Sequence, residues 1–235
     1  MSMVSPKILV GCPTHEVKDY CLELYAKAVK SLTYKNFDVL LVDNSPNDAY
    51  LEKIKSFGLN AIKGPGFETA IKRIIASRNL LRKHFLENDY DYLFSLEQDV
   101  LPPPDAIEKL LQHKKKIISG VYFNVQRNLA GKVIPLAMLW SKIEGSTGIH
   151  LSEEFIFDKP GLHEVVACGM GSVLIAREVV EKIPFRAGRS IDEGWDDMFF
   201  CGDANRNGFK IFANTSVMCQ HVTTPKGKWA GIKKF

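Results

Sequence analysis

The chain has 235 residues, of which 31 are Lys or Arg and 27 are Asp or Glu, so its formal net charge is +4. A hydrophobic fraction of 46% and a charged fraction of 25% are ordinary for a globular protein and exclude a disordered one. No apolar run approaches the roughly 20 residues that a membrane span needs. The first residues lack the basic and apolar regions of a signal peptide, so we expect one folded domain without a leader.

The positive excess is confined to residues 226–235, which hold four lysines and no acid. The rest of the chain is formally neutral, and we expect no nucleic-acid partner for such a body. This basic tail also carries Trp229, Ile232 and Phe235, a combination compatible with weak peripheral contact with an anionic membrane surface. A solvated, frayed terminus is the alternative interpretation.

Five cysteines are spread widely along the chain. Their number is odd and they form no Cys-x-x-Cys pair, which argues against a disulfide framework or a zinc cluster. We expect reduced, mostly buried thiols in a cytoplasmic protein. The five are Cys12, Cys21, Cys168, Cys201 and Cys219.

The first half of the chain alternates between short apolar runs and amphipathic segments. The expected strands are residues 7–12, 37–42, 59–63, 90–96 and 117–123, and the expected helices are residues 17–32, 49–57, 68–86 and 105–113. This alternation predicts an α/β fold with a parallel sheet covered by helices on both faces. Ligands of such sheets bind beyond the carboxyl ends of the strands, so the residues that follow each strand are candidates for a site.

The second half is less regular but shows no composition break that would mark a second domain. The expected strands are residues 136–140, 164–168, 172–176, 210–213 and 216–221, and the expected helices are residues 177–183 and about 197–205. Residues 141–161 are rich in loop signals, and a lid that orders on ligand binding is a hypothesis for them.

Two carboxylates, Glu97 and Asp99, follow the expected strand 90–96 and are separated by one residue. They project to the same side, which suits a divalent cation with open positions for phosphate oxygens. A solvated acidic turn is the alternative. Asp43 ends a neighbouring strand at the same edge of the sheet, which favours the cation site.

Arg78 is unusual because it falls on the apolar stripe of the expected helix 68–86, beside Ile74, Ile75 and Leu81. One interpretation is an arginine whose stem is buried and whose head reaches water. The other is an arginine whose fork of donors contacts a base or a phosphate. Because this helix precedes the strand that carries Glu97, we favour the second.

Four carboxylates occur within six residues at Asp192-Glu193-Gly194-Trp195-Asp196-Asp197. Such charges repel each other unless something uses them. Asp197 is placed to act as a general base, and Trp195 offers an apolar face to a sugar ring. The alternative is that one acid caps the helix. His221, which ends an expected strand, is a candidate metal ligand, although a lone histidine is more often structural.

The order of these motifs resembles a known family. PTHE, VDNS, SRN, LEQD, GMGS, GWDD and a late histidine follow one another as in the nucleotide-sugar glycosyltransferases of the GT-A fold, especially family 2. The resemblance covers about residues 7–222 and rests on order and spacing rather than on one motif.

The resemblance implies that Pro13, Thr14 and His15 lie along the nucleoside. Asp43, with its neighbour Asn44, would contact the base.

In this family, an arginine, an Asp-x-Asp motif and a late histidine bind the nucleotide and the metal. Arg78 would contact the nucleotide, and Glu97-Gln98-Asp99 stands at the position of the Asp-x-Asp motif that binds the metal and the diphosphate. Asp99 and His221 are the expected metal ligands, with Glu97 as a third.

Asp196 and Asp197 match the acidic pair of the family, in which the second acid is the catalytic base. The resemblance therefore implies a hexosyltransferase that uses Mn²⁺ or Mg²⁺ and inverts the anomeric centre. The donor would be a UDP- or GDP-linked sugar, and the acceptor a glycan, a lipid-linked group or a protein. Residues 1–124 would form the donor half and residues 125–225 the acceptor half of a single domain. The alternatives are a sugar-1-phosphate nucleotidyltransferase and a GT-A-like domain that binds a nucleotide or glycan without turnover.

Overall fold

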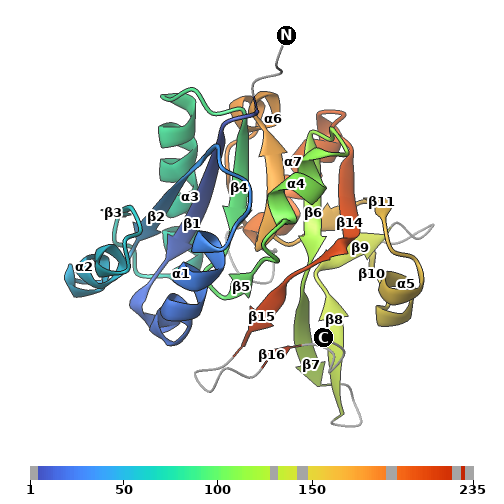
Figure 1. Cartoon of the computed structure of the whole chain (residues 1–235), viewed down its shortest axis with the longest axis horizontal. Helices are drawn as coiled ribbons and strands as arrows, with labels where there is room; N and C mark the ends of the chain where they lie inside the picture. The colour runs from blue at the N-terminus through green and yellow to red at the C-terminus, as the bar shows by residue number, and fades with distance from the viewer. Residues whose placement is uncertain (1–4, 128–131, 142–147, 189–194, 224–228, 231–235) are drawn as a thin grey trace.

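The structure, a computed structural model, describes residues 5–127, 132–141, 148–188, 195–223 and 229–230. Within these residues, eight strands form a central sheet in the order β11-β14-β6-β13-β4-β1-β2-β3 (Figure 1). Their bounds are β1 Ile8–Thr14, β2 Phe37–Asp43, β3 Ala61–Lys63, β4 Tyr92–Leu96, β6 Ile117–Val121, β11 Leu162–Val165, β13 Ser172–Ala176 and β14 Ile211–Met218.

Most of this sheet is parallel, as the alternation in the sequence predicts. β1 pairs in parallel with β2 and β4, β2 with β3, and β6 with β14. β13 comes from the second half of the chain, yet it lies between β4 and β6 and is antiparallel to both. β11 is antiparallel to β14 at the edge. The α/β class is therefore confirmed, and one strand from the second half divides the parallel set.

Helices cover both faces of the sheet (Figure 1). α1 (Leu22–Lys30), α2 (Ala49–Ser56) and α4 (Ala106–Leu111) pack on one face, where Leu22, Tyr25, Ile54 and Ile107 are in one buried cluster. α3 (Ala70–Leu86), α6 (Arg177–Lys182) and α7 (Asp196–Arg206) pack on the other, where Leu81, Phe85, Val179 and Phe200 belong to a second cluster. The central strands read as unbroken apolar runs because both of their faces are buried.

Several expected elements differ in detail. The segment 17–32 is a 3-10 helix, η1 (Glu16–Cys21), followed by α1, and the His15 side chain caps η1 by accepting from Val17 N. The expected loop 141–161 contains β10 (Ile149–His150) and α5 (Glu153–Asp158), whose N-cap Ser152 accepts from Phe155 N. A six-residue helix with one capping residue gives little periodic signal in the sequence.

Small sheets extend the core at the carboxyl edge of β4. β5 (Val100–Leu101) pairs with β15 (Gln220–Val222), and β15 pairs with β16 (Trp229–Ala230). The expected strand 117–123 is divided at Tyr122 into β6 and β7 (Phe123–Arg127), and β7 pairs with β8 (Val133–Ala137) in a hairpin that extends from the body (Figure 1). β9 (Leu139–Ser141) joins β10 and β12 (Ala167–Cys168).

All five cysteines are buried and free, as expected for reduced thiols. Among the described residues, no helix has both the length and the apolar character to span a membrane.

The loop Gly169-Met170-Gly171 is packed directly on the ring of Tyr122. A Cβ atom on Gly171 would lie 2.7 Å from Tyr122 Cζ and 2.8 Å from Val100 Cγ2. Tyr122 is 4% exposed, so its ring has little room to move. This close contact requires glycine at position 171.

We expect Gly171→Ala to destabilise the protein by about 1–3 kcal/mol, because overpacking forces neighbouring side chains out of position. Urea unfolding measures this free energy. Gly66→Ala is the matched control, since a Cβ atom there meets no atom of the described residues within 4 Å, and it should change stability by less than about 0.5 kcal/mol. Equal effects of the two substitutions would contradict the packing argument.

Candidate active site

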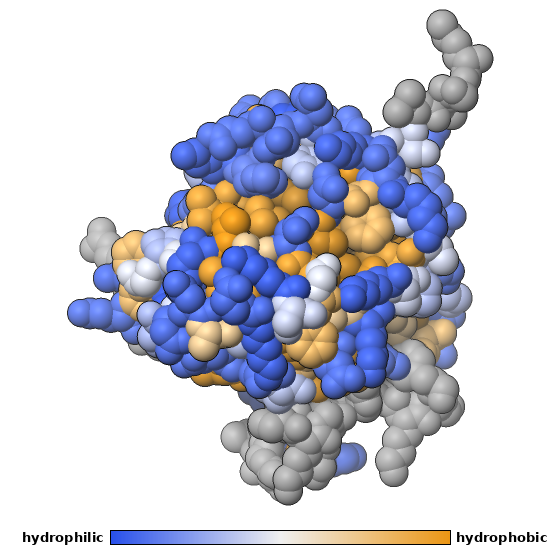
Figure 2. All heavy atoms as spheres, turned by 60° about the vertical axis from the view of Figure 1, so that its left-hand side comes forward, coloured by the Kyte–Doolittle hydropathy of each residue, from blue (hydrophilic) through white to orange (hydrophobic). Residues whose placement is uncertain are grey.

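The carboxyl ends of β1, β2 and β4 meet at one edge of the sheet. Thr14 at the end of β1 is in register with Asp43 at the end of β2, and Glu97 follows β4 directly. Two adjoining cavities open at this edge, with volumes of about 210 Å³ and 670 Å³, and His15, Asn44 and Arg73 line both. Figure 2 shows the molecule with the β3 side turned forward, where apolar surface gathers between polar side chains above and below.

The smaller cavity collects most of the donor-binding residues that the sequence predicts. Its lining includes Pro13, Thr14, His15, Asn44, Glu97, Gln98 and Asp99. Asp43, Arg78, Asp196, Asp197 and His221 are not among its lining residues. The predicted set is thus divided into residues that face the cavity and residues that lie behind or beside it.

Asp43 lies behind the cavity and is fully buried. Its Oδ1 accepts from the backbone N of Ser45 at 2.9 Å, and its Oδ2 from Nζ of Lys63 at 3.2 Å. Asn44 donates from Nδ2 to Ser77 Oγ at 3.1 Å. Asp43 therefore shapes the turn after β2, and its contact with a nucleobase stays a prediction.

Gln98 is buried and takes part in an internal hydrogen-bond network. Its Oε1 accepts from the Thr14 hydroxyl and, at 3.0 Å, from the Tyr50 hydroxyl. Its Nε2 donates to the backbone O of Lys18 at 2.7 Å. These bonds join the turn after β4 to β1, α2 and η1, so Gln98 positions the elements that surround the cavity.

Arg78 lies in the core, and its side chain is 3% exposed. Its Nε donates to Asp196 Oδ2, its Nη1 to Ser95 Oγ at 2.9 Å, and its Nη2 to Glu97 Oε1 at 2.6 Å. Burial disfavours the charged guanidinium, but the charges of Asp196 and Glu97 outweigh it and raise the pKa of Arg78. The observed contacts tie two carboxylates together, and a direct contact with a nucleotide stays a prediction.

Asp99 is a buried carboxylate with two cationic neighbours. Its Oδ2 accepts from Nζ of Lys18 and lies 3.3 Å from His221 Nε2. Burial disfavours its charge, but the hydrogen bond from His221 and the charge of Lys18 outweigh burial and lower the pKa of Asp99 to about 2. Its Oδ1 is buried and accepts no hydrogen bond from the described part of the chain.

The strand pairing brings His221 to this carboxylate. His221 is paired with Val100 in the β5–β15 ladder, and Val222 N donates to Asp99 O at 2.8 Å. His221 Nδ1 lies 2.9 Å from the carbonyl O of Phe123, which can only accept, so Nδ1 carries a hydrogen. With a hydrogen on Nδ1, the protonated ring donates from Nε2 to the Asp99 carboxylate, and the neutral ring presents a lone pair at Nε2 that a cation can accept.

The groups around Asp99 and His221 determine whether a divalent cation fits between them. No group of three or more His, Cys, Asp or Glu side chains is arranged as a metal site in the described chain. Glu97 Oε1 is bonded to Arg78, so a role of Glu97 as the third ligand stays a prediction. Asp99 and His221 lie together, with Asp99 Oδ1 unpartnered in the described chain and His221 Nε2 3.3 Å from Asp99 Oδ2. This pair fits a cation whose other positions are filled by phosphate oxygens or water.

The two aspartates at the start of α7 have different surroundings. Asp196 is 5% exposed and bonded to Arg78. Asp197 is half-buried, and its Oδ1 accepts from Met198 N at 2.7 Å. Burial, followed by the charge of Asp196, raises the pKa of Asp197 to about 6. That value suits a general base at neutral pH.

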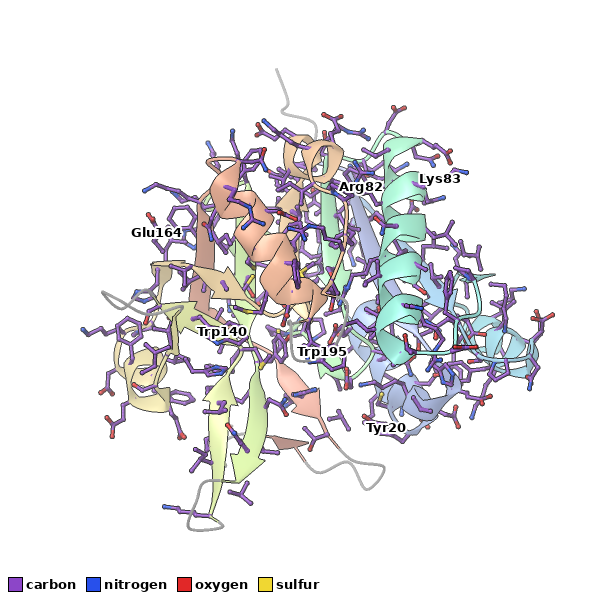
Figure 3. All side chains as sticks on the ribbon, turned by 180° about the vertical axis from the view of Figure 1, so that it is seen from behind. Tyr20, Arg82, Lys83, Trp140, Glu164 and Trp195 are labelled. Carbon is purple, nitrogen blue, oxygen red and sulfur yellow. The ribbon has the colours of Figure 1, made fainter. Side chains whose placement is uncertain are left out.

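The capping interpretation of this acidic pair is not observed. The N-cap of α7 is Trp195, and within the described residues no side chain makes a capping hydrogen bond there. Trp195 is 41% exposed and lies at the N-terminal end of α7, near the carboxyl ends of the central strands (Figure 3). Asp192 and Glu193 lie outside the described residues.

Two basic residues of the cavities are not predicted by any sequence pattern. Lys18 contacts Asp99 from η1, and Arg73 lines both cavities from the first turns of α3. Arg73 follows the Gly64-Pro65-Gly66 turn, which could have marked the start of a ligand-binding helix. Nothing in the local sequence distinguishes Lys18 from a solvated lysine.

We compared the chain with known proteins. No family model matches it, and no curated protein matches it significantly. Solved structures do match. A197 from STIV has a TM-score of 0.54 at 17% identity, with 97% of this chain and 95% of that chain covered.

Two larger structures also match. The mannosyltransferase PcManGT from Pyrobaculum calidifontis, in complex with GDP-Man and Mn²⁺, has a TM-score of 0.60 at 13% identity. GalNAc-T7 with UDP, GalNAc and Mn²⁺ has a TM-score of 0.64 at 12% identity. Each match covers 94% of this chain, which spans 59% of the first protein and 46% of the second. The chain has a GT-A-like fold, as the resemblance in the sequence predicts.

We expect Arg78→Met to destabilise the protein by about 3–5 kcal/mol, because it leaves Asp196 and Glu97 without their buried partner. Arg186→Met is the matched control: Arg186 pairs with Asp203 at 2.6 Å but is 46% exposed, so its loss should cost less than about 1 kcal/mol. Urea unfolding compares them. Adding Asp196→Asn to Arg78→Met should recover part of the loss, and no recovery would argue against charge as the cause.

The raised pKa of Asp197 predicts a pH-dependent stability. Above about pH 6 the folded protein carries a charge that it disfavours, while at about pH 4 the side chain is neutral in the folded state. Asp197→Asn should therefore melt a few degrees above the wild type at neutral pH, and the gap should close as the pH falls toward 4.

Asp203→Asn on the same helix should have the opposite sign. The hydrogen bond from Arg186 lowers the pKa of Asp203, so its charge stabilises the fold and its removal should lower the melting temperature at neutral pH. Thermal unfolding from pH 4 to 8 measures both. Parallel curves for Asp197→Asn and the wild type would refute the raised pKa.

Proposed function

We propose that this protein is a metal-dependent glycosyltransferase that moves a sugar from a nucleoside diphosphate to an acceptor hydroxyl with inversion. The observation that carries the proposal is the placement of Asp99 and His221 beside the strand-end cavities, with Arg78 connecting that edge to the α7 turn that carries Asp197. The fold neighbours PcManGT and GalNAc-T7 hold GDP-Man or UDP together with Mn²⁺. We infer the same donor class here, a UDP- or GDP-linked sugar.

The two cavities suit the two ends of a nucleoside diphosphate. The smaller one contains the cations Lys18 and Arg73, which favour the anionic diphosphate, and the carboxylate Asp99, which would hold the divalent ion. The larger one lies along the ends of β2 and β3 and includes the half-exposed ring of Phe67, which offers a flat apolar face to a base. His15 and Asn44 border both cavities and would lie along the nucleoside.

Asp99 and His221 would hold a divalent cation. When bound, the cation would neutralise charge on the departing diphosphate as a Lewis acid. An imidazole ligand favours Mn²⁺ over Mg²⁺, because Mg²⁺ takes oxygen ligands.

The transfer is a single displacement. The acceptor oxygen attacks the anomeric carbon, and the bond from this carbon to the phosphate oxygen breaks with its electron pair on the diphosphate. The acceptor proton passes to the Asp197 carboxylate. Asp196 is not free to act as a nucleophile, because it is buried on Arg78. One displacement without a covalent intermediate inverts the anomeric centre.

Residues 1–124 supply the donor half, and residues 125–225 supply the acceptor half with the Trp195 face for a sugar ring. The acceptor is a glycan, a lipid-linked group or a protein. Residues 142–147 of the proposed lid, and most of the basic tail, lie outside the described residues. Membrane contact through that tail and a cytoplasmic location stay predictions.

The proposal is tested by measuring the rate of sugar transfer from UDP- and GDP-sugars in the presence of Mn²⁺. Asp197→Asn should keep nucleotide affinity but lose about 10²–10⁴-fold in turnover. Asp203→Asn, at the opposite end of the same helix, should remain active. In the wild type, kcat/KM should fall tenfold per pH unit below about 6, where Asp197 becomes protonated. Full turnover by Asp197→Asn would overturn the assignment of the base. Absence of both transfer and nucleotide binding in the wild type would overturn the function.

A further inference from the structure

Lys18 is held in place by the same motif that supplies the metal ligand. Gln98 Nε2 donates to the Lys18 carbonyl at 2.7 Å, and Lys18 N donates to the His15 carbonyl at 2.8 Å. The Lys18 backbone is thus fixed on both sides, and its Nζ is bonded to Asp99 Oδ2. A surface lysine usually keeps its head in water, whereas this one is directed into the cavity that Glu97 and Asp99 line.

We propose that Lys18 is an exchangeable internal cation: it occupies Asp99 before the divalent ion binds and passes to the donor diphosphate when the ion takes that carboxylate. The inference rests on the proposed function. It makes Lys18 a donor-binding residue that couples metal binding to nucleotide binding.

The charges around Asp99 explain the exchange. Lys18 and His221 both converge on Oδ2, while Oδ1 has no described partner. A divalent ion on this carboxylate would place two more positive charges beside the ammonium group, which like-charge repulsion opposes. The ammonium group must therefore leave Asp99 as the ion arrives.

The surroundings limit where the ammonium group can go. Gln98 fixes its backbone, so the head stays near the smaller cavity. Glu97, the other carboxylate lining that cavity, has Oε1 bonded to Arg78. A bound diphosphate supplies the anionic oxygens that Lys18 lacks once Asp99 is taken. The ion and the diphosphate should then each strengthen the binding of the other, as thermodynamic linkage requires.

The consequence is measurable without turnover. In the wild type the ion must displace Lys18, so Mn²⁺ alone should bind weakly and a nucleoside diphosphate should strengthen its binding. Lys18→Met removes the competitor and one diphosphate contact. It should bind Mn²⁺ alone at least about fivefold more tightly, and the strengthening by UDP or GDP should be smaller. Lys18→Gln, which can still donate to Asp99 but has no charge, should show the same direction of change.

The experiment is a Mn²⁺ titration followed by electron paramagnetic resonance, with and without UDP or GDP. Lys53→Met is the matched control, since Lys53 pairs with Asp19, the neighbour of Lys18, at 2.6 Å on the surface. It removes one charge close to the site without touching Asp99. Circular dichroism and thermal unfolding check that each variant is folded.

The outcomes distinguish the proposed role of Lys18 from the metal dependence on which it rests. Tighter Mn²⁺ binding by both Lys18 variants, with an unchanged Lys53→Met, supports the exchange. Wild-type binding of Mn²⁺ that the Lys18 variants leave unchanged or weaken overturns the role of Lys18 but not the metal-dependent function. No Mn²⁺ binding by any of these proteins, with or without nucleotide, overturns the metal dependence and this inference with it.

Discussion

The buried guanidinium of Arg78 is the interaction on which the rest of the site depends. It connects Ser95 and Glu97, at the end of β4, to Asp196 in the first turn of α7. A charge this deeply buried is tolerated only when its partners are in place, so the two sides of the edge are fixed together. One side chain of α3 thereby sets the position of the proposed base relative to the proposed metal ligand.

The same pairing explains why two consecutive aspartates differ in chemistry. Asp196 is neutralised by Arg78, whereas Asp197 faces the charge of Asp196 with only Met198 N as a described donor. Burial, followed by the charge of Asp196, raises the pKa of Asp197, and the charge of Arg78 offsets only part of that rise. The two adjacent carboxylates therefore have separate environments: Asp196 is paired with a buried arginine, and Asp197 is not.

At the other carboxylate the protein supplies its own cations. Lys18 and His221 keep Asp99 charged while it is buried, and Gln98 joins Lys18 to the turn that carries Asp99. In the proposed exchange, a divalent cation takes the place of the Lys18 ammonium group on this carboxylate. The GT-A-like fold places this arrangement at the strand ends, where α/β sheets bind their ligands.

The sequence by itself determined the strands that the first half contributes to the central sheet, because strands buried on both faces are read as continuous apolar runs. It also placed Asp43, Glu97 and Asp99 at one edge, since parallel strands end together. Tertiary structure alone decided the insertion of β13 between β4 and β6 and the partners of the charged groups. Arg78 and Asp196 are 118 residues apart. Local periodicity indicates that a position is buried, but it does not indicate which distant side chain will form an ion pair with the residue at that position.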